Sequence, residues 1–177
     1  MNRDLQDIRD LVTGRRLPYH DDEYIRQAAE RLLLDRGWPR ERIRVEYRHA
    51  PRIRGQTFPV RADLVLTTSS GEPAAVVCCR RGSLVSREQE TIATARLIHS
   101  PALPLAIVTN RDDAELLETS RGRILARGLE EGLPTPERLE ELYAAHPPFH
   151  PSPDQLDKAA RIYRAFAFIQ CPGVCRA

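Results

Sequence analysis

The sequence predicts a mixed α/β fold, in which a sheet with mixed strand directions is flanked by helices and extra helices follow at the C-terminal end. Residues 43–49 alternate between apolar and charged side chains. The segments around Asp63 and Cys78 are apolar runs separated by Ser-Ser-Gly-Glu-Pro, so three strands of a meander are expected. A helical segment over residues 86–99 and a buried-type strand over residues 103–109 follow. Strands, a helix and a further strand in this order indicate an α/β core.

The N-terminal segment is expected to contain two helices before the first strand. Residues 4–12 are compatible with a short helix that ends before Thr13-Gly14. A longer helix is expected to begin at the cap-type residues His20-Asp21-Asp22 and to end at Gly37. Its apolar side chains fall on one stripe at helical spacing, namely Tyr24, Ile25, Ala28, Ala29, Leu32 and Leu33.

The C-terminal half contains several signals for helix ends. Ser86 and Gln89 have the spacing of a capping box, in which the Gln side chain reaches back to the first amide of the helix. A short helix is expected over residues 112–118. Thr135-Pro136 and Ser152-Pro153 each combine an N-cap residue with proline at the first helical position. Two more helices are therefore expected to begin there.

Composition restricts the classes of function. The chain has 177 residues, of which 41% are hydrophobic and 29% charged, as is ordinary for a soluble globular protein. No apolar stretch approaches eighteen residues and the N-terminus has no secretion signal, so the cytoplasm and no membrane contact are expected. Lys158 is the one lysine among 27 basic residues, which excludes the Gly-Lys-Ser/Thr of a P-loop NTPase.

Asp63 and the segment 77–80 form a hairpin pattern with chemical meaning. Metal-dependent nucleases often place Asp on one strand and Glu-x-Lys on the next, and the two carboxylates hold Mg²⁺ beside the scissile phosphate. The Lys shares the side of the Glu because side chains alternate with period two, and it stabilises developing charge. Here Cys78 and Arg80 stand at those two positions. The spacing is kept, but a thiol is a poor ligand for Mg²⁺.

Residues 14–120 resemble the N-terminal domain of type I restriction enzyme R subunits, a branch of the PD-(D/E)xK nuclease superfamily. The matching features are Asp22-Glu23-Tyr24-Ile25-Arg26-Gln27, Gly37-Trp38-Pro39, the Asp63 strand, the strand ending at Arg80, the helix with Gln89 and the strand into Val108-Thr109-Asn110. The resemblance implies a restriction-endonuclease-like domain over residues 1–130. Residues 131–177 would be a C-terminal helical extension packed on this domain or on a partner.

The resemblance also implies a set of site residues. Asp63 matches the metal-binding Asp, Cys78 the position of the catalytic Glu, and Arg80 the position of the Lys. Glu23 matches a helix carboxylate near the site, and Gln89 matches a helix Gln. Mg²⁺ or Mn²⁺ would be the cofactor of an active member.

Each of these residues also has a structural interpretation. Asp63 can face solvent or pair with Arg61, and Gln89 can act in the capping box. Glu23 can be a first-turn acid favoured by the helix dipole. Glu88 or Glu90 could replace the lost carboxylate from the adjacent helix, but the favoured interpretation of both is a solvated helix residue.

Arginines gather in the sequence around the first strands. They are Arg40, Arg42, Arg44, Arg48, Arg52, Arg54 and Arg61. A basic face of this kind binds phosphate groups with a salt-dependent affinity, so DNA is a candidate partner. Arg61, Arg80 and Arg81 are the expected nucleic-acid contacts, since Arg80 and Arg81 border the hairpin site. Acidic residues number 25 against 27 basic ones, so a solvated arginine surface is the alternative.

Two cysteines near the C-terminus have the spacing C-x₃-C, at Cys171 and Cys175. Some nucleases of the superfamily close their domain with a four-cysteine iron–sulfur cluster. Cys78 and Cys79 are adjacent and point to opposite faces of a strand, so the sequence does not favour such a cluster here.

The leading interpretation is a restriction-endonuclease-like domain with a degenerate nuclease site, acting as a nucleic-acid-binding or interaction module related to type I restriction. One alternative is an active, divergent metal-dependent DNA endonuclease in which Asp63 and either Glu23 or a helix Glu hold the ion. The other is a structural or partner-binding protein. In that case residues 153–170 contact a partner or a second copy through Tyr163 and Phe166.

Overall fold

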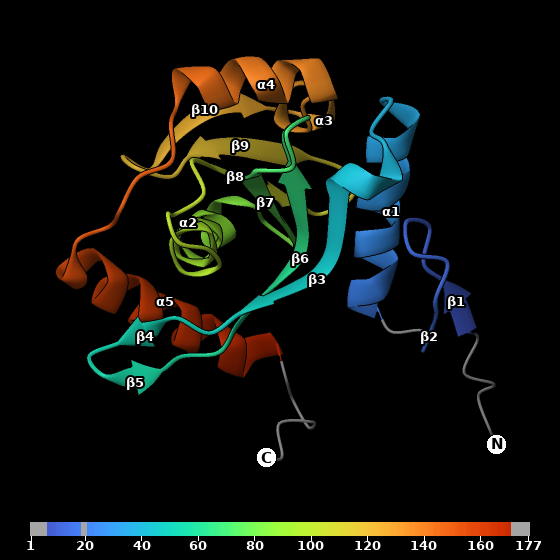
Figure 1. Ribbon diagram of the computed structural model, residues 1–177. Coiled ribbons are helices and arrows are strands. Elements are labelled where there is room, and N and C mark those ends of the chain that lie inside the picture. The colour runs from blue at the N-terminus through green and yellow to red at the C-terminus, as the bar shows by residue number, and fades with distance from the viewer. Residues whose placement is uncertain (1–6, 19–20, 171–177) are drawn as a thin grey trace, which may run out of the picture.

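The computed structural model describes residues 7–18 and 21–170, and its centre is a mixed sheet with the strand order β10-β9-β8-β7-β6-β3 (Figure 1). The strands are β3 (Ile43–His49), β6 (Val60–Thr67), β7 (Pro73–Cys79), β8 (Leu105–Thr109), β9 (Ala114–Glu118) and β10 (Arg123–Arg127). Strands β3, β6 and β7 form an antiparallel meander, β7 and β8 are parallel, and β8, β9 and β10 are antiparallel. The predicted mixed α/β fold with flanking helices is confirmed.

Helices cover both faces of the sheet. They are α1 (Asp21–Asp35), α2 (Glu88–Leu97), α3 (Leu129–Gly132), α4 (Pro136–Ala145) and α5 (Pro153–Gln170). Leu33 of α1 and Leu139 of α4 share one hydrophobic cluster with Leu64 of the sheet, which defines the α1 face. Ala95 of α2 and Ala159 of α5 share a second cluster across the sheet, which defines the α2 face. Within the described residues, no helix has the length and apolar character needed to span a membrane.

Two small hairpins and two 3₁₀ turns complete the described chain. The turns are η1 (Arg40–Arg42) and η2 (Val85–Arg87), and the hairpins are β1 (Asp7–Arg9) with β2 (Arg16–Pro18) and β4 (Arg52–Ile53) with β5 (Gln56–Thr57). The first hairpin lies beside α1 (Figure 1). The helix predicted over 4–12 is wrong for its described residues. Asp10 accepts hydrogen bonds from the amides of Val12 and Thr13 and closes a turn that pairs β1 with β2.

The helix predicted over residues 112–118 is also wrong, because Ala114–Glu118 form strand β9. Ala, Leu and Glu are strong helix formers, so the local preference favoured a helix. Hydrogen bonding to β8 on one side and β10 on the other outweighs that preference, and all five residues of β9 are buried. Strand β10 was not expected at all.

Two of the three cap signals predicted in the C-terminal half are confirmed, at Thr135 and Ser152. The Thr135 side chain accepts a hydrogen bond from the Arg138 amide, and the Ser152 hydroxyl accepts one from the Gln155 amide. The capping box at Ser86 is wrong, because η2 precedes α2 and the Ser86 hydroxyl instead donates to the carbonyl of Ser83.

Helix α5 packs on the domain through the aromatic side chain of Tyr163, which the partner-binding alternative placed at an interface. The Tyr163 ring meets the Phe58 ring edge-on at a centroid distance of 5.9 Å. The Tyr163 hydroxyl accepts a hydrogen bond from the Arg61 amide at 2.9 Å. The Arg87 guanidinium lies 5.2 Å from the centre of the Phe166 ring. These side chains therefore serve contacts within the chain, and the boundary at residue 130 remains a prediction.

Candidate functional site

Asp63 lies at an irregularity in β6, where the regular alternation of side chains between the two faces of the sheet is interrupted. Leu64 packs on the α1 face, whereas Ala62 and Val65 pack on the α2 face, so the period-two alternation is interrupted at Asp63. Glu46 lies between the residues of β3 that pair with Ala62 and Leu64, and it has a positive φ of 51°. The irregularity therefore involves both strands. Asp63 Oδ2 accepts a hydrogen bond from the Cys79 amide at 2.9 Å.

Arg80 connects Asp63 with a carboxylate on α2. Its Nη1 donates to Asp63 Oδ2 at 2.6 Å and its Nε donates to Glu90 Oε1 at 2.8 Å. Arg87 Nη1 lies 3.2 Å from the second oxygen of Glu90. Burial alone would lower the pKa of Arg80, but nearby charges led by Asp63 raise that pKa well above its usual value. A permanently charged guanidinium is thus held between two carboxylates.

Cys78 lies on the α2 face beside this ion pair and is completely buried. Burial raises the pKa of its thiol to about 12 although the charge of Arg80 lowers that pKa, and the Asp63 and Glu90 charges act in the same direction as burial. The thiol is therefore protonated at neutral pH, and it is neither a nucleophile nor a ready metal ligand. Cys79 packs on the α1 face, and burial likewise raises the pKa of its thiol well above the usual value.

These residues do not fit the Mg²⁺ or Mn²⁺ that the nuclease motif implies. Asp63 Oδ2 already accepts two hydrogen bonds, and Arg80 lies between Asp63 and Glu90. Where the nuclease motif has its second carboxylate, this chain has the buried Cys78 thiol, which is a soft ligand and is protonated at neutral pH. Among the residues that the structure describes, no group of three or more His, Cys, Asp or Glu side chains is placed to hold a metal ion.

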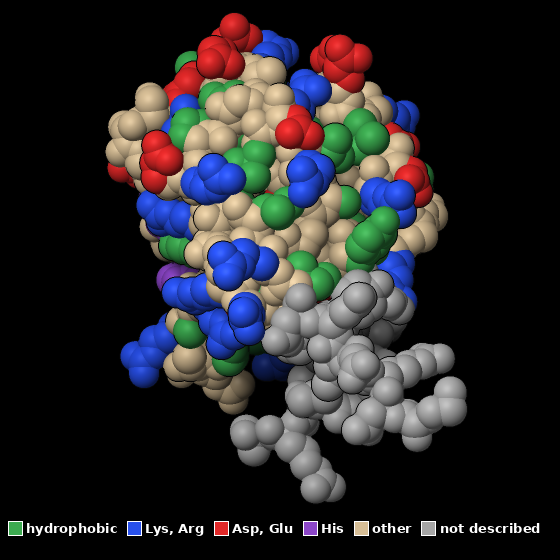
Figure 2. All heavy atoms as spheres, turned by 90° about the vertical axis from the view of Figure 1, so that its right-hand side faces the viewer, with side chains coloured by type: hydrophobic (Ala, Val, Ile, Leu, Met, Phe, Trp, Pro, Cys, Tyr) green, Lys and Arg blue, Asp and Glu red, His purple; other side chains and the backbone are tan. Residues whose placement is uncertain are grey.

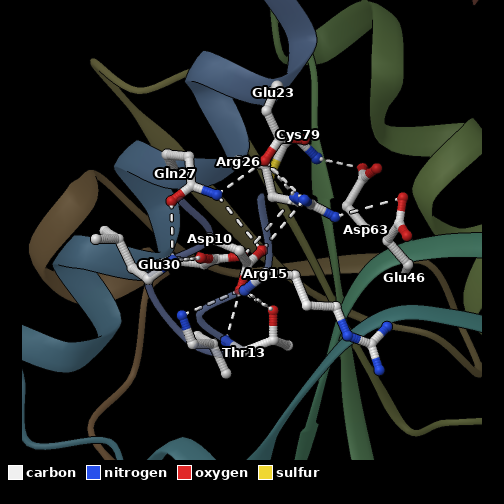
Figure 3. A network of polar contacts seen from close by, with 12 residues as sticks. Asp10, Thr13, Arg15, Glu23, Arg26, Gln27, Glu30, Glu46, Asp63 and Cys79 are labelled. Carbon is white, nitrogen blue, oxygen red and sulfur yellow. Dashed lines mark hydrogen bonds and ion pairs between the residues drawn. The ribbon is translucent and has the colours of Figure 1, made fainter. Parts of the chain in front are cut away.

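A second buried ion cluster surrounds Arg26 on α1 (Figure 3). Arg26 Nη2 lies 2.6 Å from Glu23 Oε1 and 3.2 Å from Asp10 Oδ2, and Arg26 Nε lies 3.8 Å from Glu30 Oε1. Its Nη1 faces Glu46 Oε1 at 3.6 Å. Figure 3 shows this cluster beside Asp63 and Cys79. We call these residues, Asp10, Glu23, Arg26, Glu30 and Glu46, the Arg26 cluster.

The sequence interpretation missed the Arg26 cluster except for Glu23. A local signal was available: Glu23, Arg26, Gln27 and Glu30 recur at the spacing that places side chains on one face of a helix. That face is buried by the β1–β2 hairpin, since Gln27 Oε1 and Glu30 Oε2 both accept from the Leu11 amide. A polar helix face would ordinarily be assigned to solvent.

Glu30 makes the stability of the cluster depend on pH. Burial, followed by the charge of Asp10, raises the pKa of Glu30 from 4.5 to about 8. A raised pKa in the folded state contributes stability that is fully present below the unfolded pKa and is lost as the pH rises through the folded pKa. We expect the free energy of unfolding to fall between pH 5 and 8, with a slope from this group of at most about 1.4 kcal/mol per pH unit.

Urea unfolding at several pH values checks this expectation for Glu30. The Glu30→Gln variant keeps the shape of the side chain and removes its titration, so its stability should change less between pH 5 and 8. Equal pH dependence in the wild type and the variant would contradict the assignment.

The remaining predicted site residues lie outside the Asp63–Arg80–Glu90 ion pair. Glu23 bonds to Arg26 and Gln27 in the Arg26 cluster. Gln89 is exposed on α2, one residue before the buried Glu90. The prediction of a solvated helix residue is therefore wrong for Glu90. Arg61 and Arg81 are exposed.

The arginines around the first strands are partly engaged within the chain. Arg42 contacts Glu140 and Arg54 contacts Asp157, while Arg61 lies 3.7 Å from Glu46.

Figure 2 shows the face on the right-hand side of Figure 1, where Lys and Arg side chains gather across the middle and lower half while Asp and Glu lie mainly in the upper half. This uneven distribution gives the face a basic region.

The iron–sulfur expectation concerns residues that lie outside the described part of the chain, namely Cys171 and Cys175. The two described cysteines, Cys78 and Cys79, are buried free thiols. They pack on opposite faces of β7, as their adjacency predicted.

Comparison with known proteins identifies the family. Residues 21–131 match the family model described as "Type I restriction enzyme R protein N terminus (HSDR_N)". No curated protein and no solved structure matches the chain. The matched region includes α1, the meander with Asp63 and Arg80, α2 with Glu90, and strands β8 to β10. Since it spans well over half of the 177 residues, the chain belongs to the family of type I restriction enzyme R protein N-termini.

Proposed function

We propose that this protein is a nucleic-acid-binding module related to type I restriction, which keeps a PD-(D/E)xK-type scaffold and has lost metal-dependent hydrolysis. The observation that carries the proposal is the position of Arg80 between Asp63 and Glu90, at 2.6 and 2.8 Å. In the nuclease motif the corresponding space between carboxylates belongs to a divalent cation.

The guanidinium replaces that cation electrostatically. Two carboxylates and one planar, permanently charged group form short, charge-assisted hydrogen bonds. Displacing Arg80 would leave its charge buried without these partners, which is costly. A metal ion therefore has to compete with an intact, buried ion pair.

Binding of nucleic acid is supported by the basic residues near this ion pair. Arg81 follows Arg80 directly and is exposed, and Arg61 is exposed beside Glu46. Each phosphate contact releases counterions, so affinity should fall with salt in proportion to the number of contacts. Family membership supports the same partner class, because restriction enzymes act on DNA.

A divergent endonuclease is the second candidate, and one observation favours it. Asp63 and Glu90 converge on the same guanidinium, so α2 supplies a carboxylate close to the position from which β7 has lost one. Cleavage would then depend on Asp63 and on Glu90.

The test measures cleavage and binding together. Single- and double-stranded DNA are incubated with wild-type protein and with Asp63→Ala in Mg²⁺ and in Mn²⁺. We expect no cleavage above background from either protein. Cleavage by the wild type that disappears in Asp63→Ala and Glu90→Gln would support the endonuclease instead.

Binding is followed by fluorescence anisotropy of labelled DNA and labelled RNA from low to moderate salt. We expect a salt-dependent affinity that weakens in Arg81→Ala and Arg61→Ala. The control Arg138→Ala removes an exposed arginine of α4 that pairs with Glu141, and it should bind like the wild type. A wild-type protein that binds neither DNA nor RNA at low salt would contradict the proposed function.

A further inference from the structure

A hollow lies outside the carboxyl ends of β7 and β8, next to Arg80 but separate from its ion pair. Its volume is about 350 Å³, and it is lined by Tyr24, Ile25, Arg81, Gly82, Asn110, Arg111 and Asp112. Small-molecule sites commonly measure about 300–1,000 Å³. In open α/β sheets, ligands bind outside the carboxyl ends of the parallel strands, which is where this hollow lies.

The wall of the hollow includes a flat, cationic surface. The Arg111 guanidinium lies over the ring of Tyr24, 5.0 Å from its centre, and the Tyr24 side chain is 43% exposed. Arginine planes and aromatic rings are the two surfaces on which proteins stack unpaired bases. We call Tyr24 and Arg111 the stacking plate.

The loops around the plate are held in place by Asn110. Its side-chain amide donates to the Gly82 carbonyl at 2.8 Å, which ties the loop after β8 to the loop after β7. Its side-chain oxygen accepts from the amides of Asp112 and Asp113. Arg111 is held at a φ of 90°, a conformation that side-chain-bearing residues rarely adopt. The position of the plate is therefore set by the backbone.

The charges of the lining favour an anion with an aromatic part. Arg81 and Arg111 each bring a guanidinium group to the lining of the hollow, and these groups can donate hydrogen bonds to a phosphate. A phosphate group alone would use hydrogen bonds from the guanidinium groups and leave the flat face of Arg111 unused. A nucleotide uses both, with its phosphate on Arg81 and its base on the stacking plate.

We propose that this hollow binds one unpaired nucleotide, with the base stacked on the Arg111 guanidinium, which itself lies over the Tyr24 ring, and a phosphate held by Arg81. This inference rests on the proposed function and adds a preference for single strands or strand ends, because bases inside a duplex are already stacked. A free nucleotide has the same chemistry, so the test distinguishes the two sources.

The test uses anisotropy of a labelled 15-nucleotide single strand and of the matching duplex, with the full chain. Tyr24→Ala and Arg111→Gly are each expected to weaken single-strand binding about 5- to 150-fold, in line with the loss of one stacked base. Duplex binding should change less than single-strand binding. Tyr24→Phe keeps the ring and should retain wild-type affinity. Arg111→Gly also relieves the positive φ, so loss of binding in this variant would not reflect backbone strain.

Three outcomes separate the inferences. Competition by dAMP that disappears in Tyr24→Ala would identify a free nucleotide as the occupant. Binding of the single-stranded DNA that depends on Tyr24 but is not competed by dAMP would identify nucleic acid as the occupant. Wild-type single-strand binding that is unchanged in both Tyr24→Ala and Arg111→Gly would overturn the hollow as a nucleotide site and leave the proposed function standing. Absence of all nucleic-acid binding in the wild type would overturn both.

Discussion

Replacing Arg80 with methionine is expected to lower the free energy of unfolding by about 3–5 kcal/mol. Methionine retains the apolar volume of the side chain but removes the guanidinium. The Asp63 and Glu90 carboxylates, whose side chains are 16% and 3% exposed, then lose the charge that compensates them. Urea unfolding followed by circular dichroism measures the loss.

Two further variants show whether the loss of stability comes from the Asp63 and Glu90 carboxylates that no longer have a compensating charge. Arg80→Met combined with Glu90→Gln should recover part of the stability, because one uncompensated charge is gone. Arg80→Lys should fall between the wild type and Arg80→Met, since an ammonium keeps the charge but lacks the planar fork that serves two carboxylates.

The control for this series is Arg138→Met. Arg138 and Glu141 form an ion pair in which both side chains are more than half exposed, so the expected change is below about 1 kcal/mol. If Arg80→Met were as stable as Arg138→Met, the Asp63–Arg80–Glu90 ion pair would not be a buried element of the fold. The argument that the Arg80 guanidinium occupies the place of a divalent cation would then fail.

Replacing Arg26 with methionine is expected to have an effect of similar size, again about 3–5 kcal/mol. Arg26 is 3% exposed and lies within ion-pair distance of Asp10, Glu23 and Glu30, whose side chains are at most 6% exposed. Removing this cation therefore takes the partner away from the carboxyl groups of three buried residues. Arg31→Met, on the exposed side of the same helix, is the matched control.

The Arg26 variant should also loosen the first hairpin. Asp10 accepts hydrogen bonds from Arg26 and from the turn amides of Val12 and Thr13, so it joins the hairpin to α1. Hydrogen exchange should show faster exchange at residues 8–17 in Arg26→Met, with the protection of the β8 amides less affected. Unchanged exchange at residues 8–17 would contradict this role of the Arg26 cluster.

Several elements could be predicted because their signals are local. The alternation over residues 43–49 and the apolar runs around Asp63 and Cys78 correspond to β3, β6 and β7, since a strand pattern depends on near neighbours in the sequence. Thr135 and Ser152 cap their helices as expected, because a cap is formed within four residues.

Other elements could not be predicted because they depend on distant partners. Residues 114–118 have the composition of a helix, and they form a strand only because β8 and β10 pair with them. The polar face of α1 would suit solvent, yet the β1–β2 hairpin covers it and buries Glu30 and Arg26. Glu90 could be named as a possible replacement carboxylate, but its burial was not expected.

The sequence by itself determined the α/β order, the family and the presence of Cys78 and Arg80 at the spacing of a Glu-x-Lys pair, because each depends on residue types and their local spacing. Only the tertiary structure decided that Arg80 lies between Asp63 and Glu90, and that the hollow beside it combines Tyr24 with Arg81 and Arg111. The physical reason is that these contacts join β6, β7, α1, α2 and the loop after β8. Such long-range packing is a property of the assembled core, and the spacing of residues along the chain does not reveal it.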